Sequence, residues 1–395
     1  MNPLEDTLTP ADVAAANELT RRWFAFRAEM PAAASGLGVW PLLAVLATGA
    51  SGETQEELLA AAGLDAARAA ALPAVLLDTV RSMPAIRIAL AAWAGSRVTL
   101  DPDWVDGLPV DVVGALTGDH AADKAALDAW ASDNTDGLID RMPLELDDSI
   151  LLVLASALLV RTTWTTEFAA MPITFGSGPW KGLGFESLNA TYHQDVLRVG
   201  EDASVLTVAG TDDIDVLLGL GQENLDPRAV FAHLYEAAVD PAWGRSSTEL
   251  APGERGVGVE VVEYVSPFPQ TTPEVAARTV AFELDAELDL KTDAAALGLT
   301  LASDEDRARF DRLCAQPLYV SRAKQACTAI FSATGFEAAA VTAMGMAMAG
   351  AAPQPAEHRH VLAKIAFDRP FAYLARHRPT GLVLVGGWVA EPARP

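Results

Sequence analysis

The stretch AFDRPFAYLARHRPTGLVLVGGWVAEP, residues 366–392, narrows the choice of fold more than any other part of the sequence. Apolar residues dominate both halves of it, and Pro379-Thr380-Gly381 stands between the halves. Proline followed closely by glycine is typical of a tight turn. By itself, the stretch therefore predicts a hairpin of two buried strands.

A run of small residues lies a short distance upstream, Gly335-Phe336-Glu337-Ala338-Ala339-Ala340-Val341-Thr342-Ala343. The run has no aliphatic stripe at helical spacing, so it is a weak amphipathic helix. Small side chains could instead enter a β-sheet without steric cost. The following segment, 343–354, is rich in Ala, Met and Gly and has neither charge nor a regular apolar period, which predicts an exposed loop.

Composition excludes several classes of protein. Hydrophobic residues make up 51% of the 395 residues and charged residues 21%, which is typical of a folded globular chain. The net charge of −25 would repel nucleic acid and anionic membranes, so we expect neither as a partner. The longest apolar stretch, 150–160, is too short to cross a bilayer and predicts a strand buried on both faces. Residues 1–6 lack the basic and hydrophobic regions of a secretory signal, so we expect a cytoplasmic protein, with release by another route left open.

Helical and strand patterns are mixed along the chain without a βαβ rhythm, which predicts an α+β fold. No repeat or linker divides the sequence, so we expect a single domain over residues 1–395. Helices are expected at 10–30, 41–47, 54–62 with Thr54 as the cap, 66–77, 119–139 and 289–297. Strands are expected from residue 85, at 150–160, in an antiparallel meander over 197–219, and at 257–265 and 279–284.

No set of residues suggests catalysis. No serine has the Gly-x-Ser-x-Gly setting of a hydrolase nucleophile, so we expect no catalytic residue and no enzymatic activity. His358-Arg359-His360 lacks the spacing of a metal motif and is interpreted as a solvated strand edge, and we expect neither a metal nor a cofactor. Cys314 and Cys327 are expected to be buried thiols, although the sequence leaves their pairing open.

Four blocks in sequence order resemble the serpin family, and together they extend from about residue 11 to 395. The first is Ser35-Gly36-Leu37-Gly38-Val39 with the helical segments after it, and the second contains Trp130, Thr135, Gly137 and Ile139. The third runs from Ser156 to Trp164. The last and most specific contains Phe367, Arg369-Pro370-Phe371, Thr380-Gly381, Leu384, Gly386 and Pro392. The chain is thus identified as a divergent, bacterial-type member.

The resemblance implies the serpin fold, with about three β-sheets, eight to nine helices and an exposed reactive-centre loop at about 333–360. It also implies a monomer that inhibits serine proteases irreversibly as a suicide substrate, because the cleaved loop inserts into the central sheet. By family geometry, the scissile bond is Ala349-Gly350, or the bond after Met348 or Met346 in another register. These small or unbranched side chains favour an elastase-like or subtilisin-like target protease.

Two groups of residues would serve this mechanism. The hinge of the loop is Gly335, Phe336, Glu337, Ala338, Ala339, Ala340, Val341 and Thr342. The sheet-opening region is Ser35, Gly38, Ser156, Trp164 and Gln325. Phe336 occupies an inward position where the family prefers a small residue, so its insertion would be slow or would need a preformed cavity. The alternative is therefore a non-inhibitory serpin-fold protein that serves as a binding, chaperone or recruited biosynthetic scaffold.

Overall fold

The computed structural model describes residues 3–109, 112–137, 139–147, 150–176, 178–336 and 358–393. The chain separates into two compact units of interleaved segments. The first contains residues 1–160, 285–328 and 377–385, and the second contains 161–284, 329–376 and 386–395. The single domain over residues 1–395 therefore stays a prediction, and each unit is described by itself.

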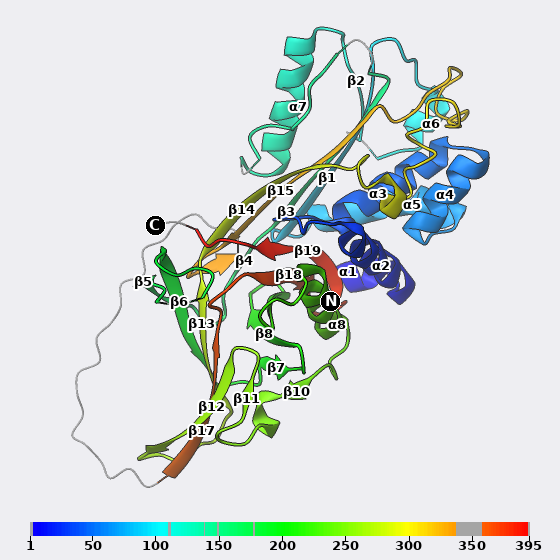
Figure 1. The fold of residues 1–395 in the computed structure, drawn as a ribbon. Coiled ribbons are helices and arrows are strands. Elements are labelled where there is room, and N and C mark those ends of the chain that lie inside the picture. Colours follow the sequence, from blue (N-terminus) through cyan, green and yellow to red (C-terminus); the bar gives the residue numbers. More distant parts are fainter. Residues whose placement is uncertain are drawn as a thin grey trace. The chain divides into compact units, whose positions relative to one another are not determined.

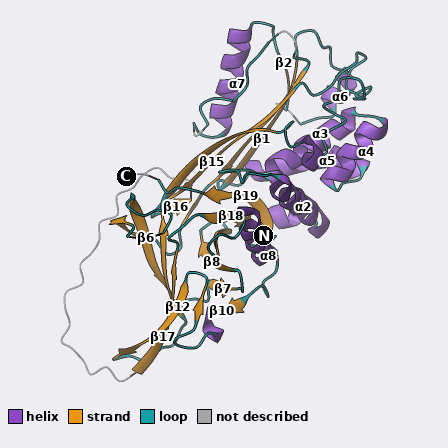
Figure 2. Cartoon of the chain, viewed as in Figure 1, coloured by secondary structure: helices purple, strands orange, loops and turns teal. Residues whose placement is uncertain are grey.

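The helices of the first unit gather mainly in its N-terminal part, where α2 to α5 form one group (Figure 2). As the sequence predicts, a helix starts after Thr9: its hydroxyl accepts from the backbone N–H of Asp12, and the Asp12 carboxylate accepts from the backbone N–H of Thr9. The helices are α1 (Pro3–Thr7), α2 (Pro10–Phe26), α3 (Gly36–Gly49), α4 (Gly52–Ala62), α5 (Ala66–Arg81), α6 (Pro102–Asp106), α7 (His120–Asn134) and α9 (Ala294–Leu297).

Two helix predictions are wrong in detail. The N-cap position of α4 is Ser51, and the hydroxyl of Thr54 instead accepts from the backbone N–H of Arg309 at 3.1 Å. The helix expected over 289–297 is reduced to the single turn of α9, and the residues before it form β14 (Phe282–Asp289). β14 takes only Asp289 of the predicted range, and tight turns follow it, in which the backbone N–H of Thr292 donates to Asp289 at 3.1 Å and that of Asp293 to Leu290 at 3.2 Å.

Long strands form the sheet of the first unit (Figure 1). Neighbours in this sheet are β2 (Val113–Ala115), β1 (Ile86–Ala94), β3 (Leu152–Val160) and β15 (Arg322–Phe331), in that order, and β14 pairs with β15. β1 and β3 are antiparallel over nine residues, from Ile86 opposite Val160 to Ala94 opposite Leu152. All nine residues of β3 are buried, as the apolar stretch in the sequence predicts.

Helix α7 covers one face of these strands. Leu127 and Ala131 of the helix pack into a core that contains Ala89 and Ala91 of β1 and alternate residues of β3. The β3 residues in this core are Val153, Ala155 and Ala157. Small side chains on the sheet let α7 approach closely. Because α3 also contacts β3, the strand is covered by helices and is buried throughout.

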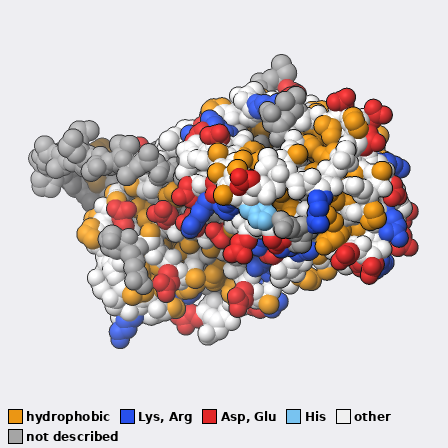
Figure 3. All heavy atoms as spheres, turned by 90° about the horizontal axis from the view of Figure 1, so that it is seen from above, with side chains coloured by type: hydrophobic (Ala, Val, Ile, Leu, Met, Phe, Trp, Pro, Cys, Tyr) orange, Lys and Arg blue, Asp and Glu red, His pale blue; other side chains and the backbone are white. Residues whose placement is uncertain are grey.

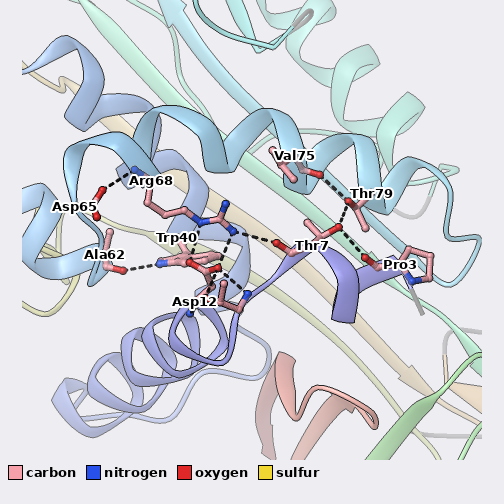
Figure 4. Close-up of polar contacts among 10 residues, drawn as sticks. Pro3, Thr7, Asp12, Trp40, Ala62, Asp65, Arg68, Val75 and Thr79 are labelled. Carbon is pink, nitrogen blue, oxygen red and sulfur yellow. Dashed lines mark hydrogen bonds and ion pairs between the residues drawn. The ribbon is translucent and has the colours of Figure 1, made fainter. Parts of the chain in front are cut away.

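A polar network fixes α5 to the N-terminal segment of the chain (Figure 4). The guanidinium of Arg68 donates to both carboxylate oxygens of Asp12, at 3.0 and 2.7 Å, and to the carbonyl of Thr7 at 3.2 Å. Burial by itself would raise the pKa of Asp12, but the hydrogen bonds from Arg68 and Thr9 outweigh burial and hold this pKa below its ordinary value. Asp12 is therefore an ionised, fully bonded group at neutral pH.

In the second unit, β16 (Gly335–Phe336) pairs with the end of β15 and with β4 (Thr162–Thr163), and the remaining strands form two six-stranded sheets. One sheet has the order β10-β7-β8-β9-β18-β19, in which β7 to β9 are the meander predicted over 197–219. The other has the order β11-β12-β17-β13-β6-β5. Helix α8 (Pro227–Val239) packs on β8 and β9, and the 3-10 turn Ser247–Glu249 lies beside β7, so both belong with the sheet that contains the meander. The strands are β5 (Ala169–Thr174), β6 (Gly184–Tyr192), β7 (Leu197–Val199), β8 (Ala203–Ala209), β9 (Ile214–Gly221), β10 (Arg245–Ser246), β11 (Arg255–Gly256), β12 (Val259–Ser266), β13 (Glu274–Val280), β17 (His358–Ala366), β18 (Phe371–His377) and β19 (Leu382–Val389).

The predicted C-terminal hairpin is present as β18 and β19, with Gly381 at φ 71° in the turn between them. In all, the described residues contain nine α-helices and three sheets, which agrees with the predicted α+β architecture. No single helix among them is long and apolar enough to cross a membrane, although α4 and α5 pass that test together as a bent pair. The face drawn in Figure 3 mixes acidic, basic and hydrophobic side chains.

Candidate functional site

The described part of the hinge consists of Gly335 and Phe336, which already form a strand. This strand, β16, pairs with the end of β15 through Phe331 and Phe336, and with β4 through Gly335–Thr163 and Phe336–Thr162. The rest of the hinge, Glu337 to Thr342, lies outside the described residues. So do the predicted scissile-bond residues Ala349 and Gly350 and the alternatives Met348 and Met346. The start of the hinge is thus held on both sides by neighbouring strands.

A tight turn reverses the chain between β15 and β16. The backbone N–H of Ser332 donates to the carbonyl of Gly335 at 2.9 Å, and Trp164 donates from its backbone to Thr334 at 3.0 Å. A Cβ atom on residue 335 would lie 2.4 Å from the carbonyl oxygen of Thr162. Only glycine therefore lets β16 approach β4 this closely.

Phe336 lies inside the protein, in the inward position that the sequence predicts. Its side chain is 1% exposed, and its ring centroid lies 6.2 Å from that of Tyr373. The ring is therefore already packed in the interior of the uncut chain. Sequence reasoning did not name Tyr373 as a neighbour, although its position two residues after Phe371 places both on one face of a strand.

Trp164 supports the turn from the neighbouring segment. Its indole N–H donates to the carbonyl of Ser332 at 2.9 Å, and its ring lies 4.8 Å from that of Phe331. The side chain is buried. Of the five predicted sheet-opening residues, Trp164 is the one that contacts the turn before the hinge.

The other four sheet-opening residues meet in the first unit. The amide of Gln325 donates to the carbonyl of Ser35 at 2.9 Å and to the hydroxyl of Ser156 at 3.2 Å, and its oxygen accepts from the backbone N–H of Ser35 at 2.9 Å. Ser35 also caps α3, because its hydroxyl accepts from Gly38 at 3.0 Å and donates to the carbonyl of Leu384 at 2.5 Å. We call Ser35, Ser156 and Gln325 the buried polar triad.

Every member of the buried polar triad is fully buried, so its hydrogen bonds have no competition from water. A Cβ atom on residue 38 would lie 2.8 Å from the Gln325 amide nitrogen, which explains the glycine at that position. Cys327 lies beside the triad, and burial raises the pKa of its thiol to about 12. Cys327 and Cys314 are both buried free thiols, as the sequence predicts.

The parallel pairing of β3 with β15 is short. It joins Val153–Ala157 to Arg322–Ala326 and extends no further in the described residues. Gln325 lies opposite Ser156, so the buried polar triad stands one residue from the end of this pairing. A place where paired strands separate is where an additional strand could be accepted.

The histidine pair near the end of the loop differs in part from its prediction. His358 to His360 pair with β12 alone, since β13 joins β17 only from Leu362, and His358 and Arg359 are exposed as predicted, whereas His360 is buried. Its Nε2 lies 2.6 Å from the carbonyl of Phe268, and its Nδ1 lies 3.3 Å from a carboxylate oxygen of Glu274. No group of three or more His, Cys, Asp or Glu in the described residues is arranged to hold a metal ion.

A family model described as serpin (serine protease inhibitor) matches residues 17–174 and 267–392, more than half of the chain. The chain belongs to the serpin family. Plasminogen activator inhibitor 1 of Sus scrofa is 36% identical over 112 residues, which cover 28% of this serpin and 25% of the relative. Glia-derived nexin of Mus musculus is 24% identical over 293 residues, covering 69% of this chain and 64% of the relative.

Solved serpin structures share the fold over nearly the whole chain. Native protease nexin-1 with heparin matches with a TM-score of 0.71 at 20% identity, covering 99% of this serpin and 100% of that chain. Tengpin, a thermophilic serpin in the native state, matches with a TM-score of 0.73 at 17% identity, covering 96% of this serpin and 93% of that chain. This serpin matches only a quarter of the length of the Sus scrofa inhibitor.

Proposed function

We propose that this serpin is an irreversible suicide-substrate inhibitor of serine proteases. The observation that carries the proposal is the position of Gly335 and Phe336, which form the first residues of a strand between the end of β15 and β4. After loop cleavage, the residues that follow Phe336 would continue β16 as a longer strand. The inhibitor supplies a trap and no catalytic group.

The protease carries out the first chemical step, the acylation of its own serine. The serine hydroxyl of the protease attacks the carbonyl carbon of Ala349, an ester bond forms, and the Ala349-Gly350 amide bond breaks, with the amine of Gly350 leaving after it takes a proton. Water would then hydrolyse the ester. Strand insertion carries the esterified protease away and distorts it before hydrolysis occurs. Met348 and Met346 are alternative acyl positions in another register, and the side chains in all three cases suit elastase-like or subtilisin-like specificity pockets.

Alternation fixes which hinge residues face the interior. Because Phe336 points inward, Ala338, Ala340 and Thr342 would follow it inward, while Glu337, Ala339 and Val341 face solvent. Small inward side chains bury no charge and need no large cavity. Roughly ten new strand hydrogen bonds at about 1 kcal/mol each make insertion comparable in free energy with the stability of a domain.

A protease panel tests this function. The full chain is incubated with pancreatic elastase, subtilisin and trypsin, and the products are separated by denaturing electrophoresis. We expect a covalent complex with elastase or subtilisin. Ala340→Arg should be cut without forming the complex, because it buries a charge during insertion, whereas Ala339→Arg is a matched control with the same charge facing solvent. If all three proteases only cut the wild-type loop, the inhibitory function is wrong.

The non-inhibitory scaffold is the less favoured alternative. Phe336 and the residues at the sheet-opening positions motivated it, and the ring of Phe336 is already buried in the uncut chain. One relative matched by sequence is named plasminogen activator inhibitor 1, which supports the inhibitory function.

A further inference from the structure

Exposed apolar side chains concentrate at one end of β12. Seven large hydrophobic side chains are strongly exposed in the described residues, and three of them, Tyr264, Val265 and Phe268, lie within five positions. They are 40%, 60% and 64% exposed, respectively. We call these three residues, which lie at the end of β12 and in the loop after it, the β12 tip. A local concentration of this kind is typical of a surface that meets another protein.

The β12 tip is held in a fixed conformation. The side-chain amide of Gln270 donates to the carbonyl of Val361 at 2.9 Å and accepts from its N–H at 2.8 Å, so it replaces a strand partner on β17. The backbone carbonyl of Phe268 lies 2.6 Å from His360 Nε2, and Phe268 stands between Pro267 and Pro269. Little conformational entropy would be lost when such a segment binds, which favours an interaction role.

Both faces of the tip are apolar with a polar rim. Tyr264 lies over His360, with ring centroids 5.1 Å apart, and its hydroxyl donates to Glu274 at 2.6 Å. Val265 faces the opposite side because successive side chains alternate along a strand. On that side, Arg359 forms an ion pair with Glu263 at 2.9 Å. An apolar centre with paired charges around it is the composition of a protein–protein contact.

One edge of β12 is also open. β11 pairs with β12 only at Val259 and Glu260, and no strand in the described residues covers that edge from Val262 to Ser266. An open edge beside exposed apolar side chains invites pairing with another chain. The family model resumes its match at residue 267, so β12 lies in a stretch that the family pattern does not cover.

The β12 tip lies beside the first residues of β17, where the described structure resumes after the reactive-centre loop. Ser266 pairs with His358 and Val265 with Arg359, at the start of β17. Seven residues lie between Gly350 and His358, so eight residue-to-residue steps join the two. They span at most roughly 26–29 Å when fully extended. A protease that holds the Ala349-Gly350 bond in its active site is therefore tethered within reach of the tip.

We propose that the β12 tip is a docking surface for the body of the protease whose active site holds the loop. The inference rests on the proposed function, because it takes the loop to be the bait. The tip contacts an apolar patch on the protease outside the active-site cleft. It thereby raises the rate at which the loop is attacked and selects among proteases that accept the same cleavage sequence.

The test measures the rate of loop cleavage in the full chain. Wild type is compared with the double variant Val265→Thr, Phe268→Ser, using subtilisin and pancreatic elastase, and with Met171→Ser as a control. Met171 is 56% exposed on β5, at the opposite edge of the same sheet. A synthetic peptide of residues 337–357 measures cleavage without the tip. Thermal melting checks that the variants remain folded.

We expect the double variant to slow loop cleavage about 10-fold with at least one of the two proteases, which corresponds to about 1.4 kcal/mol. Met171→Ser should match wild type, and the wild-type chain should be cut faster than the peptide by the affected protease. Equal rates for wild type and the double variant with both enzymes would overturn the docking surface, as would a loop that neither enzyme cuts. Whether the product is a covalent complex or a cut chain is scored separately, so failure of the inhibitory function remains distinguishable.

Discussion

At the scale of single residues, Gln325 makes the buried hydrogen bonds on which the first sheet depends. Four buried polar groups find a partner in its amide: the N–H and the carbonyl of Ser35, the hydroxyl of Ser156 and the thiol of Cys327. A buried polar group left without a partner costs about 1–3 kcal/mol. The loss of this one side chain therefore affects the backbone at the cap of α3 as well as β3.

Gln325→Leu should lower the free energy of unfolding by about 3 kcal/mol or more, because it keeps the side-chain volume and leaves these groups unpaired. Ser156→Ala is the control, since it removes only the 3.2 Å bond and should cost about 1 kcal/mol. Denaturant unfolding measures both. Equal losses for the two variants would mean that Ser35 is satisfied in another way.

Phe336 gives a second test at this scale. Phe336→Ala should destabilise the native protein by about 3–5 kcal/mol, because it empties a cavity beside Tyr373. The variant should still trap its protease, since the inserted strand has only lost a large side chain. Denaturant unfolding and the fraction of protease captured per loop cut are the two measurements. A variant of unchanged stability would contradict the buried position of the ring.

At the scale of elements, the first turn of α2 is stabilised by charge. Asp12 closes the capping box of this helix and accepts two hydrogen bonds from Arg68 of α5, as Figure 4 shows. A carboxylate near a helix N-terminus also interacts favourably with the helix dipole. The joint between α2 and α5 therefore depends on the ionised form of Asp12.

The pKa of Asp12 lies below its unfolded value of about 3.9, so its contribution is present above that pH and is lost as the pH falls through the folded pKa. Asp12→Asn should be less stable than wild type by about 1–3 kcal/mol at pH 7, and the difference should shrink below about pH 4. Asp78→Asn, which removes an exposed ion pair with Arg81, should change stability little at either pH. A gap between Asp12→Asn and wild type that is independent of pH would show that charge is not the cause.

At the scale of the whole molecule, the proposed mechanism requires that the uncut chain is not in its most stable state. Insertion adds strand hydrogen bonds that the uncut chain does not make, so cleavage should stabilise the protein. We expect loop cleavage by a protease that is not trapped to raise the thermal midpoint by tens of degrees. Calorimetry before and after cleavage measures the change, with Ala340→Arg as the control that is cut but does not insert. An unchanged midpoint in the wild type would exclude strand insertion.

Local patterns in the sequence predicted elements better than contacts. The hairpin of β18 and β19, the buried strand β3 and the start of α2 follow from alternation, a long apolar run and a capping residue, all of which are local. The helix expected at 289–297 is only the turn Ala294–Leu297, because β14 ends at Asp289 and tight turns occupy the residues up to Asp293. The meeting of Ser35 with Gln325, 290 positions apart, could come only from the family resemblance. Tyr373 behind Phe336 was missed for the same reason, since no local pattern joins them.

The bond between Ser35 and Leu384 has a consequence for synthesis. Ser35 donates to a carbonyl 349 positions later, and Asn17 bonds both Gly381 and Val383. Ribosomes make the N-terminal end first, so α2 and α3 are produced long before the strand that completes their bonding. During translation, these polar groups therefore bond to water or to a chaperone. A nascent chain stalled before residue 381 would lack the residues that bond them in the folded protein.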